Sequence, residues 1–337
     1  IAIFNLPFFK NNYLTILSLV FFYFFINILF EIYLRNKDHI YKIFSAFSIF
    51  FLFMNYTNLK NFGSEIQINL IYILISYYII KNIYQKNFRK KEILIIKILL
   101  LYFFSILIRL NSIIILPAIL IIIIMNYKVV IVSFKNNYSI YFFIIFFSVL
   151  YLFKNFLVTG CLAYPLYFTC FENVPWGSGI SQAEFRYYHL SAQSKGYLLK
   201  LINEGFIDNI FDYYKYKNNI DFESPKDYLK NFSWIKYWWK YEYDKIRILN
   251  VLLILLFLFF VTYAINFKKF SVRIINLNCT LLFIFFIPII SWFLLLPQSR
   301  YGGYAIFFVF LTYFIANLFR DSKFYINPLL IFFMLFS

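Results

Sequence analysis

Charged residues are scarce in this chain, and acidic residues are scarcer than basic ones. Only 14% of the residues are charged and 63% are hydrophobic, and 32 Lys and Arg outnumber 15 Asp and Glu. An ordinary soluble domain carries about 25% charged residues, so this composition argues against one. Runs such as Ile93–Ile108 carry almost no charge. Repeated along a chain, such runs indicate an all-α polytopic membrane protein.

The chain also lacks the short motifs of nucleotide and hydrolase chemistry. It has no Walker A loop, no GxGxxG, no GxSxG and no HExxH. No hydrophobic run contains the paired acids that mark a proton or cation pathway. With only two histidines and three cysteines, we expect no metal site and no cofactor. A nucleotide-driven enzyme or pump is therefore disfavoured.

Ten hydrophobic runs are assigned as membrane spans, several of them shorter than the ~20 residues of a straight crossing. The two at 93–108 and 112–126 are separated by a short break, and a single broken helix is the alternative there. The runs that we assign are 13–32, 40–56, 66–80, 93–108, 112–126, 139–157, 248–266, 274–296, 304–318 and 326–337.

The basic residues predict the orientation of these spans. Alternate connectors hold fifteen Lys and Arg, and the opposite set holds four. By the positive-inside rule the first set is cytoplasmic, which places the long polar segment 158–247 outside, facing the periplasm. The net charge of +17 is thus a topology signal, and we expect no nucleic-acid partner. Three parts follow: a bundle over 1–157, the external loop 158–247 and a second bundle over 248–337.

The two ends of the chain resemble cut ends. The sequence starts at Ile1 without a methionine and stops inside an apolar run. The orientation also places residues 1–12 outside, whereas a bacterial chain of this kind usually starts inside. We therefore expect a fragment, with at least one span and a first external loop preceding Ile1.

Two cysteines open the long loop, with eight residues between them. Cys161 and Cys170 are both predicted outside, where an oxidising compartment permits disulfides. A disulfide is favoured over two unpaired thiols that pack as small apolar groups. Its loop closure would contribute roughly 2–3 kcal/mol.

Four ionisable residues lie at the predicted outer ends of spans: Glu65, Arg109, Lys154 and Arg300. Ionisable groups at membrane depth are functional candidates by default. Arg and Lys suit phosphate recognition, and Glu65 could act as a general base or pair with one of the cations. Structural ion pairs and snorkelling side chains are the alternative for each residue alone. Convergence of several on one face favours a site.

The loop itself contains two predicted helical segments. Residues 181–206 predict a helix whose polar and apolar faces are mixed. Residues 226–247 show apolar positions at helical spacing and include Trp234, Trp238 and Trp239. A helix rich in Trp and Lys just before a span is typical of the membrane interface.

Six sequence elements stand out by their order and spacing. They are FGSEIQINL at 62–70, IRLNSIIILP at 108–117, KNFLVTGCLAYPLYFTCFENVPW at 154–176, AQSKGYL at 192–198, YLKNFSWIKYWW at 228–239 and PQSRYGGY at 297–304. Together they resemble a family of bacterial polytopic membrane proteins from surface-polysaccharide contexts. The resemblance covers most of the chain, and the GC…YP…TCF…W stretch and RYGGY are its most specific parts.

Proteins of that family look like distant GT-C glycosyltransferases. The resemblance implies a GT-C-like fold and transfer of a sugar from a polyprenyl-phosphate donor to a glycan or lipid acceptor at the bacterial inner membrane. The main base would lie in the first external loop, before Ile1, and Glu65 stands where the family usually has Asp. The phosphate would be bound by Arg109, Arg300 and Lys154. A polysaccharide polymerase or ligase acting on lipid-linked oligosaccharide is the alternative, and a flippase or transporter is the third.

Overall fold

The secondary structure that can be described is helical, as the sequence predicts. The computed structural model describes residues 13–36, 38–54, 64–172, 174–177, 179–206, 223–230, 232–240, 279–297, 305–306, 309–310 and 312–313. Its helices are α1 (Tyr13–Arg35), α2 (His39–Met54), α3 (Ser64–Tyr84), α4 (Phe88–Ile108), η4 (Leu110–Ile115), α5 (Leu116–Met125), α6 (Tyr127–Asn136), α7 (Tyr138–Thr159), η5 (Tyr167–Thr169), α8 (Ile180–Ser194), α9 (Tyr197–Asn203), α11 (Pro225–Lys230) and α13 (Cys279–Leu295). Residues 234–240 are also helical.

The chain divides into two compact units. The first unit comprises Ile1–Asn136, Phe257–Ser291 and Gly302–Ser337, and the second comprises Asn137–Leu256 and Trp292–Tyr301. The predicted boundary between bundle and loop lies at residue 157, whereas the observed one lies at residue 136. Helix α7 therefore groups with the loop that follows it.

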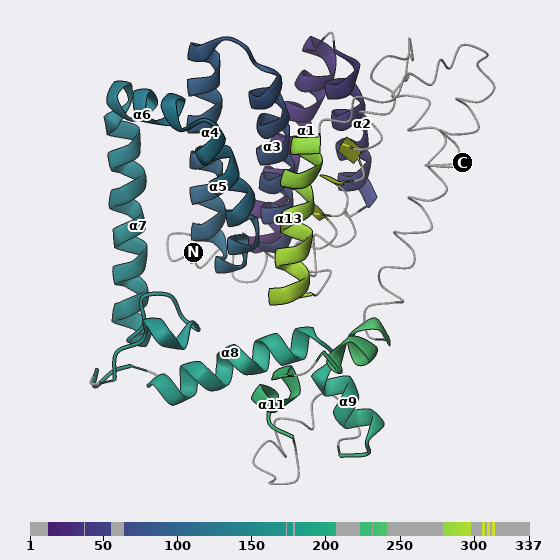
Figure 1. Cartoon of the computed structure of the whole chain (residues 1–337), viewed down its shortest axis with the longest axis vertical. Coiled ribbons are helices and arrows are strands. Elements are labelled where there is room, and N and C mark those ends of the chain that lie inside the picture. Colours follow the sequence, from purple (N-terminus) through teal and green to yellow (C-terminus); the bar gives the residue numbers. More distant parts are fainter. Residues whose placement is uncertain are drawn as a thin grey trace, which may run out of the picture. The chain divides into compact units, whose positions relative to one another are not determined.

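Helix α3 is the most deeply buried element of the first unit. Every residue from Leu70 to Ile75 is at most 3% exposed, so this helix is covered on all sides. It packs against α4 and α1, and α1 packs against α2 (Figure 1). At the end of α3, the hydroxyls of Tyr84 and Tyr313 lie 3.3 Å apart, which links α3 to the chain's last part. A helix that is apolar on every face fits such a central position.

A sharp break separates α4 from α5. Arg109 has an extended backbone (φ −160°, ψ 130°) between α4 and the short η4 helix. The Ser112 hydroxyl donates to the Ser105 carbonyl at 2.9 Å across the break, and a proline opens α5. Figure 1 shows α5 running back alongside α4. The two segments are thus separate antiparallel helices, and the alternative of one long broken helix is wrong.

Helix α6 was not predicted. It lies at 87° to the segment Leu110–Met125, and its end is joined to the start of α4 by Asn136, whose amide donates to Glu92 at 3.2 Å. Because it contains Lys128 and Lys135, this segment is predicted from the sequence to be a connector between two spans. The helix has apolar and polar positions at helical spacing, which is the pattern of a helix lying along a surface.

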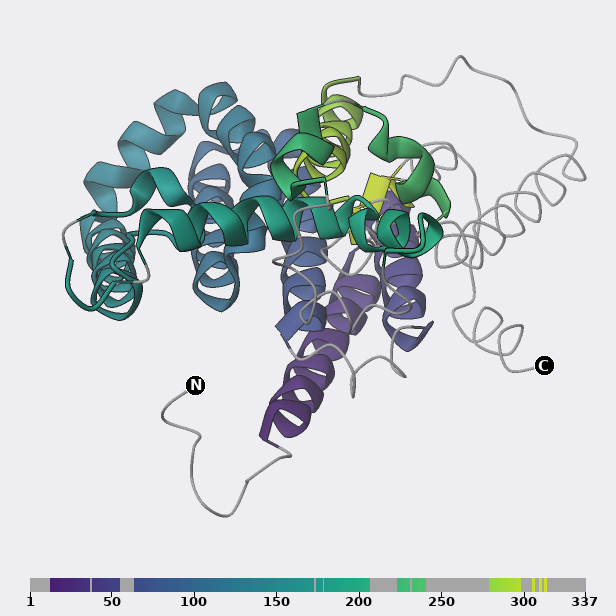
Figure 2. The same ribbon diagram turned by 90° about the horizontal axis from the view of Figure 1, so that it is seen from below.

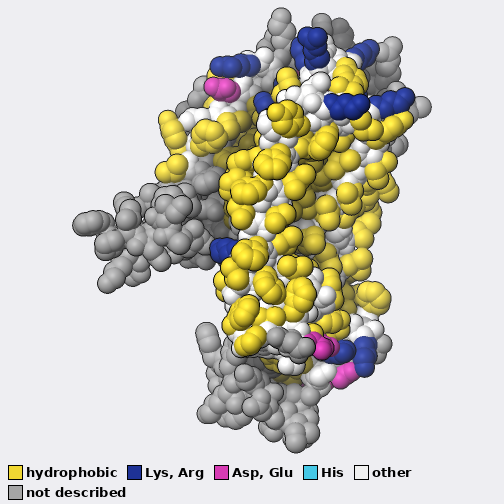
Figure 3. Space-filling view, turned by 90° about the vertical axis from the view of Figure 1, so that its left-hand side faces the viewer, with side chains coloured by type: hydrophobic (Ala, Val, Ile, Leu, Met, Phe, Trp, Pro, Cys, Tyr) yellow, Lys and Arg dark blue, Asp and Glu magenta, His cyan; other side chains and the backbone are white. Residues whose placement is uncertain are grey.

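Helix α7 contrasts with α3, because none of its residues is buried. It is the one described helix that is long and apolar enough by itself to span a membrane, and the bent pair of Leu110–Met125 with α6 could provide a second span. The described part of the chain thus offers one or two such helices against the ten predicted. Hydrophobic side chains cover most of the described surface on the face in Figure 3.

Several of the predicted spans coincide with helices, and others lie outside the described residues. Helices α1 to α5, α7 and α13 match predicted runs within a few residues. The predicted spans 248–266 and 326–337 lie outside the described residues, and 304–318 is described only at six positions. The helical class is confirmed, and the number of membrane crossings stays a prediction.

Short helices accompany α8 in the second unit. The predicted helix over 181–206 is confirmed as α8 and α9, with a break at Lys195 and Gly196 between them. Helix α11 packs along α8, with the Lys226 ammonium 2.8 Å from a Glu184 carboxylate oxygen, and Figure 2 shows the short green helices of this unit beside the long teal helix α8. The break at Gly196 requires a glycine, because its φ is +85° and a Cβ there would lie 2.8 Å from the Tyr237 carbonyl carbon.

Candidate functional site

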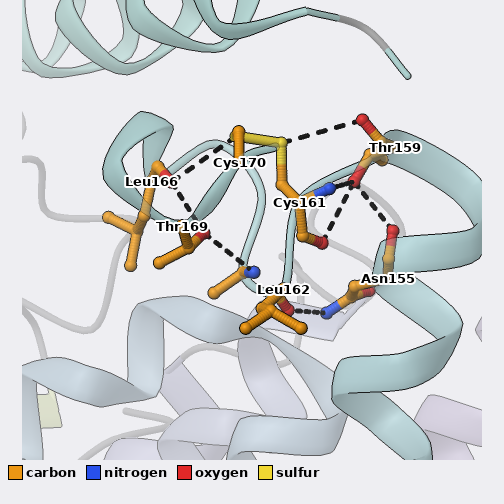
Figure 4. Close-up of a disulfide and its surroundings, with 8 residues drawn as sticks. Asn155, Thr159, Cys161, Leu162, Leu166, Thr169 and Cys170 are labelled. Carbon is orange, nitrogen blue, oxygen red and sulfur yellow. Dashed lines mark hydrogen bonds between the residues drawn. A yellow bond between two sulfur atoms is a disulfide. The ribbon is translucent and has the colours of Figure 1, made fainter. Parts of the chain in front are cut away.

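The disulfide predicted at the start of the long loop is present in the structure. Cys161 and Cys170 are joined, with their Cα atoms 3.8 Å apart (Figure 4). We call the closed segment Cys161–Cys170 the knuckle. The backbone N–H of Leu162 donates to the Thr169 carbonyl at 3.1 Å, and the Thr169 hydroxyl donates to the Leu166 carbonyl at 2.7 Å. The knuckle is therefore braced by hydrogen bonds as well as by the disulfide.

Helix α7 and the knuckle are joined without a linker. Gly160 caps α7 in the left-handed conformation (φ +74°), and its N–H donates to the Phe156 carbonyl. The Asn155 amide of α7 donates to the Leu162 carbonyl at 3.3 Å (Figure 4). A Cβ on Gly160 would lie 2.9 Å from the Gly177 Cα, so the chain after the knuckle passes directly over the end of the helix. Only glycine fits this crossing.

An apolar groove of about 360 Å³ lies between α7 and the knuckle. One side is formed by α7 residues spaced at one helical face, and the other by the residues that follow each cysteine. The Phe156 ring is packed edge-on against Phe171 at 5.3 Å. Because no polar side chain lines the groove, a hydrocarbon chain is the chemistry that it can hold. Its lining is Val149, Leu152, Phe153, Phe156, Leu162 and Phe171.

The four predicted site residues have different outcomes. Arg109 is half-buried at the break between α4 and η4, in the first unit. Lys154 is exposed on α7, in the second unit, and does not line the groove. Glu65 lies in the first turn of α3, but its side chain and all of Arg300 lie outside the described residues. Their convergence on one phosphate stays a prediction.

The three tryptophans predicted at the membrane interface divide into two groups. Trp234 and Trp238 are only 2% and 7% exposed, whereas Trp239 is 58% exposed. The Trp238 ring packs edge-on against Phe293 at 5.2 Å, and its indole N–H donates to the Pro297 carbonyl. Trp234 and Trp238 thus face the protein, whereas Trp239 is exposed, and the place of all three at a membrane interface stays a prediction. Helical spacing alone cannot tell a lipid-facing stripe from a protein-facing one.

Lys195 is a buried cation that the sequence reasoning missed. It follows α8, and 8% of its surface is exposed. Its ammonium lies 4.9 Å from the centre of the Trp234 ring, and its carbonyl accepts a hydrogen bond from the Tyr228 hydroxyl at 2.9 Å. Burial lowers the pKa of the Lys195 ammonium from 10.5 to about 8. The signal available in the sequence was its place within AQSKGYL, one of the elements that carry the resemblance.

A second charged cluster lies close to this lysine. Lys200 of α9 forms an ion pair with Glu223 and lies 3.8 Å from Glu204, and its ammonium is 5.5 Å from the Tyr228 ring centre. This lysine is fully partnered, so it fastens the segment before α11 to α9. Among the described residues, no three His, Cys, Asp or Glu side chains come together as metal ligands would.

Comparisons with known proteins give one positive result. A family model described as Domain of unknown function (DUF8201) matches residues 1–308, so the chain belongs to that family. No curated protein matches the chain, and no solved structure matches it.

Proposed function

We propose that this member of the family is an integral-membrane glycosyltransferase of the GT-C type. It would transfer a sugar from a polyprenyl-phosphate donor to a cell-surface glycan or lipid acceptor at the outer face of the bacterial inner membrane. The observation that carries the proposal is the junction of α7 with the knuckle. There an apolar helix with no buried residue leads directly to an apolar groove beside a braced loop. The donor has a long hydrocarbon chain and a charged phosphate. Its binding site therefore needs an apolar surface for the chain next to polar groups for the phosphate.

The topology that goes with this function has ten spans and an external loop over 158–247. The disulfide between Cys161 and Cys170 supports an external loop, because disulfides persist in oxidising compartments and are rare in the cytosol. The absence of buried residues along α7 supports a helix whose solvent is lipid, because a helix that is apolar all round must be covered by something apolar.

The proposed reaction is a single displacement at the anomeric carbon. The acceptor oxygen forms a bond to C1 of the sugar, the bond from C1 to the phosphate oxygen breaks, and polyprenyl phosphate leaves. A carboxylate takes the proton of the acceptor hydroxyl, and Glu65 is the candidate within this chain. Arg109, Arg300 and Lys154 are the candidates for stabilising the leaving phosphate. The configuration at C1 is inverted.

The test uses the full chain reconstituted in vesicles with a synthetic polyprenyl-phosphate sugar and an oligosaccharide acceptor. Release of polyprenyl phosphate and an inverted glycosidic bond would support the proposal. Glu65→Gln should lower kcat by a factor on the order of 10² to 10⁴ if this carboxylate is the base. Glu172→Gln, which changes an exposed acid of the loop, is the matched control and should leave kcat unchanged.

The competing functions give different products in the same vesicles. A polymerase or ligase would transfer whole oligosaccharide units and leave the monosaccharide donor intact. A flippase would move the donor between leaflets without breaking any bond. Either result would overturn the proposal.

A further inference from the structure

Three sequence elements that are far apart in the chain meet around Lys195. They are AQSKGYL at 192–198, YLKNFSWIKYWW at 228–239 and the segment around Pro297 that opens PQSRYGGY. The Lys195 ammonium lies over Trp234, and Trp238 donates to Pro297. Parts of three of the six elements that carry the resemblance thus meet in one cluster of the second unit.

The packing within this cluster is tight. The Tyr228 hydroxyl donates to the Lys195 carbonyl, and the ring centres of Tyr197 and Tyr228 lie 5.2 Å apart. Gly196 leaves no room for a Cβ against the Tyr237 carbonyl. The backbone on both sides of Lys195 is therefore fixed, and the lysine side chain is held in place before any ligand arrives.

The charge of Lys195 is only partly compensated by the protein. Among the described residues, no carboxylate lies within 4 Å of its ammonium, because every ion pair there involves another cation. The Trp234 ring face offers a cation–π contact, and the end of α8 offers the negative pole of the helix. An ammonium has three protons, and a ring beneath it occupies only one side, so the group keeps the capacity to donate to an anion.

We propose that Lys195 binds the phosphate of the lipid-linked donor, with Trp234 as the platform beneath its ammonium. This inference rests on the proposed function for the identity of the donor. A phosphate supplies the negative charge that the cluster lacks, and burial strengthens the attraction because the local dielectric is low. Lys195 is then a phosphate-binding residue of the second unit.

The pKa of Lys195 gives this assignment a distinct signature. An amine with a pKa near 8 loses its charge between pH 7 and 9, and a bound phosphate raises that pKa because it favours the charged form. The titratable groups on the elements next to it are Glu184, Arg186, Tyr187, Tyr188 and His189 of α8, Tyr197 and Lys200 of α9, Lys226, Asp227, Tyr228 and Lys230 of α11, Lys236, Tyr237 and Lys240 of helix 234–240, and the nearby acids Glu204 and Glu223. Burial raises the pKa of Tyr228, so its hydroxyl does not ionise in the same window.

The experiment measures binding of farnesyl phosphate to the full chain in detergent between pH 7 and 9, with inorganic phosphate and farnesol as separate probes. For the wild type, affinity for farnesyl phosphate should fall about tenfold over this range, following the charged fraction of Lys195. Lys195→Arg should retain its affinity at pH 9, because arginine stays charged. Lys195→Met should bind at least tenfold more weakly at pH 7, whereas Lys240→Met, which removes an exposed lysine of helix 234–240, should bind as the wild type does.

Each remaining outcome decides the matter. Equal pH profiles for the wild type and Lys195→Arg would overturn the assignment, and so would equal binding of farnesol. Binding of inorganic phosphate as tight as that of farnesyl phosphate would show a free-anion site and also overturn it. Should Lys195→Met fail to fold, judged by tryptophan fluorescence, the comparison with arginine still decides. If Lys195→Met transfers sugar as fast as the wild type, this inference alone is overturned. If Lys195 binds farnesyl phosphate as expected but the protein transfers no sugar, the proposed function alone is overturned.

Discussion

Replacing Lys195 by methionine should change how the stability of the second unit depends on pH. Burial disfavours the charged lysine and lowers its pKa from 10.5 to about 8. This shift corresponds to a loss of about 3 kcal/mol in the free energy of unfolding at neutral pH. The contact with Trp234 opposes this penalty by up to about 2 kcal/mol. The net penalty is therefore between about 1 and 3 kcal/mol. Methionine fills a similar volume without the charge, so the variant should lack this penalty.

The direction of the pH effect follows from proton binding. Between pH 8 and 10.5 the unfolded lysine is protonated and the folded one is largely neutral, so the unfolded state binds more protons. Stability of the wild type should thus rise with pH through this window. Below pH 8 both states are charged and the penalty is complete, and above pH 10.5 it disappears. The variant should show no such rise from this position.

The assay is tryptophan fluorescence during thermal unfolding at pH 7, 8, 9 and 10, because Trp234 and Trp238 are buried beside the lysine. The difference in apparent Tm between the methionine variant and the wild type should shrink by roughly 2–12 °C from pH 7 to 10. Other titrating groups contribute equally to both proteins and cancel in the difference. A Tm difference that is constant across this range would refute the reasoning, since Lys195 would then keep an ordinary pKa.

Three further changes test the second unit. Gly160→Ala should lower stability by more than the roughly 1–2 kcal/mol of a left-handed backbone, whereas Gly205→Ala, at a φ of +76° with nothing within 4 Å of its Cβ, should lose only that amount in thermal unfolding; equal losses would contradict the close crossing. Cys161→Ser should lower stability by roughly 2–3 kcal/mol, and reductant should lower the Tm of the wild type but not of this variant. Trp238→Phe leaves the Pro297 carbonyl without its donor and should lose about 1–3 kcal/mol, whereas Trp239→Phe at an exposed position should lose under about 0.5 kcal/mol; the reverse order in chemical unfolding would contradict the observed burial.

The elements that the sequence predicted well are those with local causes. Hydrophobic runs gave α1 to α5 and α7 to within a few residues, because helix formation in an apolar stretch depends on nearby residues. The disulfide was likewise predictable from spacing and the expected compartment. Helix α6 was missed because its lysines made it look like a connector, although the same lysines fit one side of a helix lying along a surface.

The features that could not be predicted depend on partners far away in the sequence. Trp234 and Trp238 are buried because Trp292 and Phe293 cover them, and no local pattern reveals that contact. Lys195 resembles any loop lysine until Trp234 is placed under it. The sequence likewise places Arg109 at a helix break, but whether it binds a phosphate depends on distant residues and stays a prediction.

The absence of buried side chains along α7 determines which substitutions this helix can tolerate. A helix whose side chains mostly face its solvent is constrained by hydrophobicity and length, and one apolar residue there can replace another at little cost. Helix α3 is constrained by the shape of every neighbour, because interiors are close-packed. A library that shuffles Phe, Leu, Ile and Val along α7 should therefore yield mostly functional chains outside the groove-lining positions. The same shuffle along α3 should yield few.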